Sequence, residues 1–269
     1  MMNLTQAAIF GVLQGATEFL PISSSGHLAL AHHFLGAQEA ELAFDVTLHL
    51  GTLLAILIYF RADFLDMAMA LLGKNRNPQE TGRLRLLLFM LVIATIPGAL
   101  AGLLLGHLAE DSFRDPLLVA GALATAGGLL LAADRLGRRN RDFAEIGLRD
   151  ALFIGLSQAL AIVPGVSRSG STISAGLALG LTRQAAVRFS FLLSAPIIFG
   201  AGVHELPKII RAGLLTDQLS IYLTGLIASA LSGYLVIAFL MRFIRTRSLA
   251  IFAWYRFALA GVVVLALLL

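Results

Sequence analysis

The chain has 269 residues, of which 58% are hydrophobic and only 13% are charged. Soluble domains carry about 25% charged residues on average, so this composition excludes a soluble domain and predicts an all-α protein that crosses a membrane several times. Cysteine is absent, which excludes disulfides and cysteine-bound metal, and the net charge of +4 comes from short basic gaps between apolar segments rather than from a nucleic-acid surface.

The first predicted element is an apolar segment from residue 4 to residue 35 that is broken in the middle. The break is Pro-Ile-Ser-Ser-Ser-Gly-His at residues 21–27. Pro21 prevents the first arm from continuing as a helix, and each arm falls short of the roughly 20 residues that span a bilayer. We interpret the segment as a re-entrant helical hairpin, because irregular backbone at membrane depth must be buried in protein or line a wet cavity.

Six unbroken apolar runs and a second broken segment make up the remainder of the chain. The broken segment covers residues 151–181, and its break at 164–172 reads Pro-Gly-Val-Ser-Arg-Ser-Gly-Ser-Thr. It predicts a second re-entrant hairpin with the same helix, turn and shorter helix. The six runs are each predicted to span the membrane, and they lie near residues 44–60, 84–106, 116–133, 186–203, 219–241 and 250–268.

Basic residues concentrate in three of the gaps between these runs, namely 61–85, 134–149 and 242–247. The positive-inside rule assigns such loops to the cytoplasm. With six spans, both chain ends then lie outside. The first hairpin enters the membrane from outside and the second from the cytoplasm.

The two halves of the chain, residues 1–135 and 145–269, resemble each other within one membrane domain. Each would hold one hairpin and three spans, and an odd number of spans makes two repeats insert in opposite directions. The sequence therefore predicts an inverted-topology repeat. The positions that can be set against each other are Gly11, Gln14, Pro21, Ser25 and Gly26 in the first half and Gly155, Gln158, Pro164, Ser169 and Gly170 in the second.

The two breaks form the candidate functional site, because an inverted repeat brings broken helices together near the midplane of the membrane. Gln14 and Glu18 are four residues apart and share one helix face. After each break a helix is expected to restart, near Gly26 in the first hairpin and near Ser171 in the second. Serine is a favoured N-cap, and a helix N-terminus suits an anion.

A phosphate group is the expected ligand of this site. Arg168 can make bidentate contacts to phosphate oxygens. Glu18 would be repelled by phosphate, so it must act as a base, hold a divalent cation or orient a neighbour. His27 can transfer protons near neutral pH, and Ser24 or a neighbouring serine can be a nucleophile. The alternatives are a structural Glu18–Arg168 ion pair and serines that only cap or pack.

Three histidines and an aspartate near the site are expected to play lesser parts. Asp45 and His49 lie on one face near the start of a span, and we expect them to be structural or to act through other residues. His32 and His33 are expected to lie at the membrane interface.

The two breaks also resemble known signatures. Residues 14–27 resemble the first signature of the undecaprenyl-diphosphate phosphatase family, also called the bacitracin-resistance family, and residues 164–172 resemble the second. The C-terminal Tyr-Arg-Phe at 255–257 is similar as well. The resemblance implies hydrolysis of undecaprenyl diphosphate to undecaprenyl phosphate and inorganic phosphate, which recycles the lipid carrier of bacterial cell-wall synthesis and gives bacitracin resistance. It also implies a divalent cation, Mg²⁺ or Ca²⁺.

By position, the resemblance implies a catalytic role for Glu18, Ser24, His27 and Arg168, with Glu18 also as the metal ligand. Many members of the family have a second glutamate where this chain has Gln14, so a metal site that needs two carboxylates is in doubt here. The nucleophile stays open between Ser24, His27 and water. The residues expected to bind substrate are Gln14, Ser23, Ser25, Gly26, Ser167, Ser169, Gly170 and Thr172.

The expected partners are a polyprenyl diphosphate lipid and the bilayer itself, with a homodimer left open and no nucleic acid. The expected location is the bacterial inner membrane, with an active site that opens to the periplasmic face. The main alternative function is a transporter or flippase of polyprenyl phosphate lipids that uses the same midplane site, because inverted repeats with broken helices are common in transporters. A carrier of small ions or anions through Arg168 is a second alternative.

Overall fold

The structure is a computed structural model, and it describes residues 2–35, 41–74, 78–111, 115–211 and 218–268. These residues are almost entirely helical and contain no β-strand, which confirms the all-α prediction. Two short 3-10 helices, η1 (Phe143–Glu145) and η2 (Leu160–Ile162), accompany the α-helices. The α-helices are α1 (Leu4–Phe19), α2 (Ser24–Leu35), α3 (Glu41–Tyr59), α4 (Arg61–Leu71), α5 (Pro78–Asp111), α6 (Pro116–Leu136), α7 (Leu148–Ala159), α8 (Arg168–Ala178), α9 (Arg183–Arg211), α11 (Leu219–Phe243) and α12 (Ala250–Leu268).

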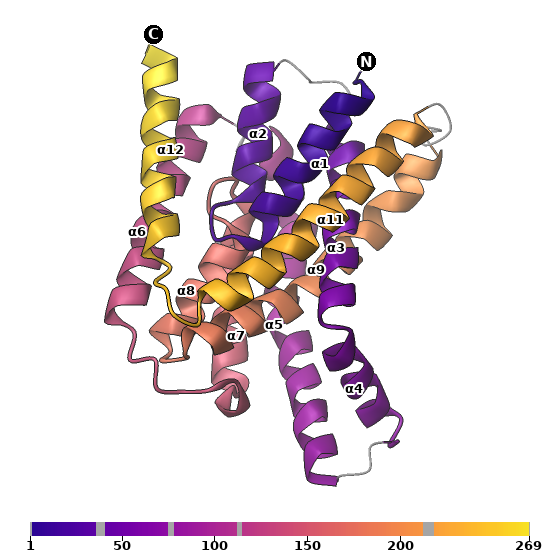
Figure 1. Ribbon diagram of the computed structural model, residues 1–269, viewed down its shortest axis with the longest axis vertical. Coiled ribbons are helices and arrows are strands. Elements are labelled where there is room, and N and C mark those ends of the chain that lie inside the picture. Colours follow the sequence, from indigo (N-terminus) through magenta and orange to yellow (C-terminus); the bar gives the residue numbers. More distant parts are fainter. Residues whose placement is uncertain (1, 36–40, 75–77, 112–114, 212–217, 269) are drawn as a thin grey trace.

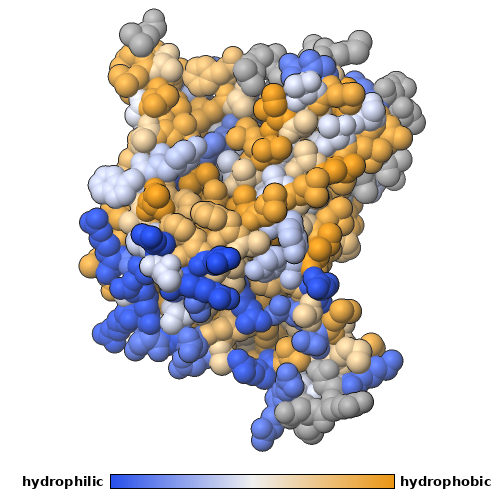
Figure 2. Space-filling view, viewed as in Figure 1, coloured by the Kyte–Doolittle hydropathy of each residue, from blue (hydrophilic) through white to orange (hydrophobic). Residues whose placement is uncertain are grey.

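Five helices in the described part of the chain are long and apolar enough to cross a membrane: α5, α6, α9, α11 and α12. A sixth candidate is α3 taken together with α4, which are bent by 75° against each other. Large apolar side chains lie exposed along these helices, and they cover the middle and upper part of the surface in Figure 2. Such a surface suits contact with lipid, so the chain is a multi-pass membrane protein.

The predicted loop at 61–85 is wrong in its extent, because most of this gap is helical. The helix α4 starts directly after the bend, and α5 starts at Pro78, several residues before the predicted run. The guanidinium of Arg85 on α5 donates to the carbonyl of Ala70 at the end of α4, at 2.8 Å. This bond adds a side-chain donor to a carbonyl that also accepts from the backbone N–H of Gly73 at 3.2 Å, and it ties α5 to the end of α4.

Both chain ends lie at one end of the bundle, together with α2 (Figure 1). The connections from α6 to α7 and from α11 to α12 lie toward the opposite end, where hydrophilic residues gather in Figure 2. These connections carry basic residues. The arrangement therefore separates the basic connections from the chain ends, as the predicted topology requires.

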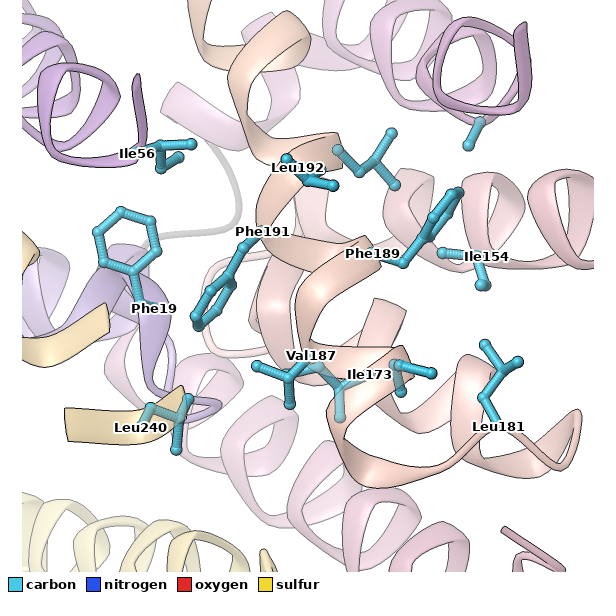
Figure 3. Packing of buried hydrophobic residues seen from close by; sticks show 14 of the residues in the cluster. Phe19, Ile56, Ile154, Ile173, Leu181, Val187, Phe189, Phe191, Leu192 and Leu240 are labelled. Atoms are coloured by element: carbon cyan, nitrogen blue, oxygen red, sulfur yellow. The ribbon is translucent and has the colours of Figure 1, made fainter. Parts of the chain in front are cut away.

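The central helix of the hydrophobic core is α9. Its side chains Val187, Phe189, Phe191 and Leu192 are fully buried, and Figure 3 shows side chains of α1, α3, α7, α8 and α11 in the same cluster. The ring of Phe19, the last residue of α1, packs edge-on against Phe191, with 5.3 Å between ring centroids. The core therefore holds the end of α1 at the point where the first break begins.

The first arm of each hairpin is fixed by a backbone-to-backbone contact with a long helix. A Cβ added at Gly11 on α1 would lie 2.5 Å from the carbonyl oxygen of Gly225 on α11. A Cβ added at Gly155 on α7 would lie 2.6 Å from the carbonyl oxygen of Ala94 on α5. Small residues permit such close helix packing in membranes, so both arms have little freedom to shift.

A buried carboxylate ties three helices together at the end of the bundle opposite the chain ends. Asp134 on α6 accepts hydrogen bonds from Arg183 on α9, at 2.5 and 3.0 Å, and from the hydroxyl of Ser248 just before α12, at 2.5 Å. Asp150 on α7 is likewise bound by both terminal nitrogens of Arg141, at 2.8 and 2.7 Å. These pairs fix the polar ends of the helices and lie outside the two breaks.

Candidate active site

The two breaks meet in direct contact. The backbone N–H of Gly165 in the second break donates to Ser23 Oγ in the first, at 3.1 Å. In the other direction, Ser169 Oγ donates to the carbonyl of Leu20, also at 3.1 Å. A Cβ at Gly26 would lie 3.2 Å from Gly165 Cα, so the backbones of the two breaks touch. The predicted meeting of the two breaks is thus present in the structure.

Each break ends in the same kind of cap. Ser23 and Ser167 have positive φ angles of 75° and 71°, a backbone conformation that non-glycine residues adopt at a cost. Ser23 Oγ accepts from the N–H of Gly26 at 3.2 Å, and Ser167 Oγ accepts from the N–H of Gly170 at 3.0 Å. This turn lets α2 and α8 begin at once, at Ser24 and Arg168, which is two and three residues earlier than predicted.

Glu18 is the centre of the polar cluster. Its buried carboxylate accepts hydrogen bonds from the guanidinium of Arg168, from the hydroxyl of Ser24 and, at 2.9 Å, from the side-chain amide of Gln14. His49 Nε2 on α3 lies 3.7 Å from the same carboxylate. Four predicted site residues therefore come together, and His49, which was expected to be structural or indirect, lies beside them.

His27 is turned away from this cluster. Its Nδ1 lies 2.7 Å from the carbonyl of Ser23 and its Nε2 lies 2.8 Å from the hydroxyl of Tyr255 on α12. A carbonyl can only accept, so Nδ1 carries the proton and Nε2 accepts from the tyrosine. Both ring nitrogens are thus occupied by groups other than Glu18 and Ser24.

The remaining predicted residues join and cap the two breaks. Ser25 Oγ lies 3.3 Å from Ser23 Oγ, and Ser169 Oγ lies 3.2 Å from Ser167 Oγ, so the two breaks repeat the same hydroxyl pair. Thr172 Oγ1 donates to the carbonyl of Arg168 at 2.8 Å and lies 2.6 Å from the hydroxyl of Ser190 on α9. Gly26 and Gly170 offer the N–H groups that the caps bind.

Sequence reasoning assigned no role to Tyr255 and Arg256, which α12 brings to the two breaks. Arg256 is fully buried, and its Nη2 donates to the carbonyls of Gly165 at 2.6 Å and Val166 at 2.8 Å. The available signal was an arginine inside an apolar run, since ionisable groups at membrane depth mark function. His32, which was expected at the membrane interface, has a buried ring that stacks on Phe10 and lies 3.2 Å from Asp45.

The residues of the cluster offer an incomplete set of ligands for a divalent cation. Among the described residues, no group of three or more His, Cys, Asp or Glu side chains is placed to hold a metal ion. Glu18 supplies one carboxylate, and Gln14 Oε1, one helix turn away, is buried without a hydrogen-bond partner in the described part of the chain. Mg²⁺ is often held by one or two carboxylates plus substrate phosphates, so this donor set fits a cation that the substrate completes.

Comparison with known proteins gives matches over the whole chain. The family model described as "Bacitracin resistance protein BacA" matches residues 7–262. The undecaprenyl-diphosphatase of Rubrobacter xylanophilus is 46% identical over 100% of both chains. That of Trichlorobacter lovleyi is 47% identical over 99% of this chain and 98% of its own, and that of Geobacter sulfurreducens is 46% identical over 99% of both. These matches include both breaks and the segment of α12 that contacts them.

Proposed function

The chain belongs to the family of the bacitracin resistance protein BacA, and on this premise we propose that it hydrolyses undecaprenyl diphosphate to undecaprenyl phosphate and inorganic phosphate. The three relatives named above are called undecaprenyl-diphosphatases, and each matches this chain over nearly its whole length. The reaction would recycle the lipid carrier of cell-wall synthesis and thereby protect against bacitracin. One observation carries the proposal: a serine hydroxyl donates to a buried carboxylate beside an arginine, where two helices begin.

The geometry supports Ser24 as the nucleophile. Its hydroxyl already donates to Glu18, which can take the proton as Ser24 Oγ attacks the terminal phosphorus. The bond from this phosphorus to the bridging oxygen then breaks, and undecaprenyl phosphate leaves. Water would hydrolyse the phosphoserine and restore the serine. His27 as nucleophile has less support, because Tyr255 occupies its Nε2; direct attack by water is the remaining alternative.

Arg168 and the two helix N-termini would stabilise the charge on the phosphoryl group. In the structure the guanidinium of Arg168 is held by Glu18, so a bound phosphate would compete with the carboxylate for it. The N-terminus of α8 begins at Arg168 itself, and that of α2 begins at Ser24. Both present backbone N–H groups and a partial positive charge. Their attraction to the phosphoryl group would strengthen as negative charge develops on its oxygens.

A divalent cation, Mg²⁺ or Ca²⁺, would be held by Glu18 and Gln14 together with phosphate oxygens of the substrate. Such a cation would neutralise negative charge on the diphosphate. The unpartnered oxygen of Gln14 supports this assignment. Because Gln14 carries no charge, the cation should bind weakly without substrate.

We propose further that the fold consists of six spans and two re-entrant hairpins in an inverted-topology repeat. Matched contacts support this arrangement, since α1 packs on α11 in the way that α7 packs on α5. The corresponding caps of Ser23 and Ser167 support it as well. The protein would lie in the bacterial inner membrane with the site open to the periplasm, in keeping with basic connections at the end opposite the chain ends. A homodimer stays a prediction.

The alternative function, a lipid transporter or flippase, has no support from the comparisons. The relatives named above all carry the name of a hydrolase. The further alternative is a carrier that binds anions through Arg168. This function would give the hydrogen bond between Ser24 and Glu18 no role.

Phosphate release by the purified full-length chain in detergent tests the hydrolase proposal. The substrate is undecaprenyl diphosphate with magnesium, and the variants are wild type, Ser24→Ala and Ser157→Ala. Ser157 on α7 is the matched control, because its hydroxyl donates only to the carbonyl of Ile154 in its own helix, at 2.7 Å. We expect a loss of at least about a thousandfold for Ser24→Ala, since removal of a serine nucleophile can cost about 10⁶-fold in turnover, and near-normal turnover for Ser157→Ala. Absence of phosphate release by wild type would refute the hydrolase function.

The orientation is tested separately by cysteine labelling, since the natural chain has no cysteine. Arg138→Cys and Arg245→Cys, in the two basic connections, should react with a membrane-impermeant maleimide only after the inner membrane is opened. Labelling of either from the periplasm of intact spheroplasts would overturn the proposed orientation.

A further inference from the structure

Arg256 is a buried cation, and its hydrogen-bond partners among the described residues are all backbone carbonyls. Its side chain is fully buried, Nη2 donates to Gly165 O and Val166 O, and Nη1 lies 3.4 Å from Pro21 O. No carboxylate lies within ion-pair distance of it among the described residues, and its Nε is buried without a partner. A single guanidinium thus binds carbonyls from both breaks.

This arrangement provides hydrogen-bond donors to backbone carbonyls of the two breaks. The end of a helix leaves up to four carbonyls unpaired, and carbonyls that are buried within a membrane protein need donors from the protein itself. Arg256 supplies donors for carbonyls of both breaks at once. Carbonyl contacts alone, however, do not balance a full charge at membrane depth, where an unpaired charge is costly to bury.

The balance of charge at the breaks makes Arg256 different from Arg168. Glu18 holds the guanidinium of Arg168, so these two charges cancel. Arg256 therefore leaves the cluster with one net positive charge. Its Nη1 also lies beside the first turn of α8, because a Cβ at Gly170 would be 2.9 Å from it. The charge of Arg256 and the positive end of α8 consequently act on the same small volume.

We propose that Arg256 is a positioning residue for the diphosphate head group: it ties the two breaks together, and its unbalanced charge gives the resting site its affinity for the anion. The proposal deepens the function proposed above, because the anion is the head group of the same lipid substrate. Arg168 would then bind phosphate only after its ion pair with Glu18 has opened. The charge of Arg256, in contrast, would attract the anion while that ion pair is still closed.

Binding of methylenediphosphonate, a diphosphate mimic that cannot be hydrolysed, tests this assignment without turnover. The dissociation constant is measured by titration calorimetry on the purified full-length chain at a fixed concentration of free magnesium, for wild type, Arg256→Gln and Arg183→Gln. Arg183 is the matched control, since it is an arginine that pairs with the buried carboxylate of Asp134 and lies outside the two breaks. Thermal unfolding of each variant is followed in parallel.

We expect Arg256→Gln to bind the mimic at least about tenfold more weakly than wild type, while Arg183→Gln loses thermal stability and binds within about twofold. Equal binding by wild type and a folded Arg256→Gln would overturn the proposal. Because the mimic is not cleaved, this outcome is independent of whether wild type releases phosphate from the lipid.

A second variant, Arg256→Lys, tests the proposal if Arg256→Gln does not fold. In Arg256→Lys the introduced ammonium is buried and can lose its proton in the working pH range, whereas arginine stays charged. The ratio of the dissociation constants of variant and wild type should therefore rise at least about fivefold between pH 6 and pH 9.5. A constant ratio would overturn the proposal, since a purely structural tie does not depend on this charge.

Discussion

The exchange of Glu18 for glutamine separates its proposed chemistry from its contribution to stability. The carboxylate accepts hydrogen bonds from Arg168, Ser24 and Gln14. In Glu18→Gln the guanidinium of Arg168 loses its counter-charge, and removal of one partner of a buried pair costs about 3–5 kcal/mol. Removal of a general base lowers turnover by roughly 10²–10⁴-fold, or about 3–5 kcal/mol of transition-state stabilisation. We expect both losses in this variant.

The control is Asp134→Asn, because Asp134 has the same kind of surroundings outside the breaks. It is a buried carboxylate that accepts from an arginine, Arg183, and from a serine hydroxyl, Ser248. Thermal unfolding should show a similar loss of stability for both variants. Phosphate release per folded molecule should fall only for Glu18→Gln. The assignment of Glu18 as base is wrong if this variant keeps more than about a tenth of wild-type turnover, or if Asp134→Asn loses as much.

Three further predictions concern the metal, the second break and the polar end of the bundle. Gln14→Glu adds a carboxylate one turn from Glu18, so half-maximal activation by magnesium should occur at about tenfold lower concentration, and an unchanged activation curve would contradict the metal assignment. Gly165→Ala should lower the free energy of unfolding by about 2–5 kcal/mol in a thermal or urea titration, because φ is +97° and a Cβ would lie 2.6 Å from a backbone oxygen. Burial disfavours the charge of Asp150, but the hydrogen bonds of Arg141 and of the Gly147 N–H, together with the charges of Arg141 and Arg149, outweigh it and hold the pKa of this carboxyl below its ordinary value. Stability from this pair is therefore fully present above about pH 4 and is lost as the pH falls through the lowered pKa, so the difference in unfolding temperature between wild type and Asp150→Asn should shrink in acid; a difference of the same size at about pH 7 and about pH 3 would argue against it.

Much of the fold could be predicted from sequence because hydropathy and helix breakers act locally. Each of the five longest apolar runs lies within one helix, and both breaks occur where proline and a group of serines and glycines interrupt the apolar pattern. The helix α4 was missed because it carries charges and follows a sharp bend. Charge composition alone does not distinguish such a helix from a loop.

The site was predictable to the extent that its residues are local to the breaks. Glu18, Ser24 and Arg168 were expected from charge and capping, and the structure brings them into contact. Tyr255 and Arg256 could not be placed, because their partners lie 228 and 91 residues away in sequence and no periodicity tells which helices pack together. For the same reason, the orientation of His27 toward α12 could not be foreseen.

The reciprocal bonds between the two breaks limit how the protein can move. Ser23 accepts from Gly165, Ser169 donates to Leu20, and Arg256 holds carbonyls on both sides. A carrier that works by alternating access rocks one half of its structure against the other. Here each such cycle would have to break and re-form all of these hydrogen bonds between the two breaks. A rigid junction of this kind suits an enzyme that receives and releases its lipid on one side of the membrane.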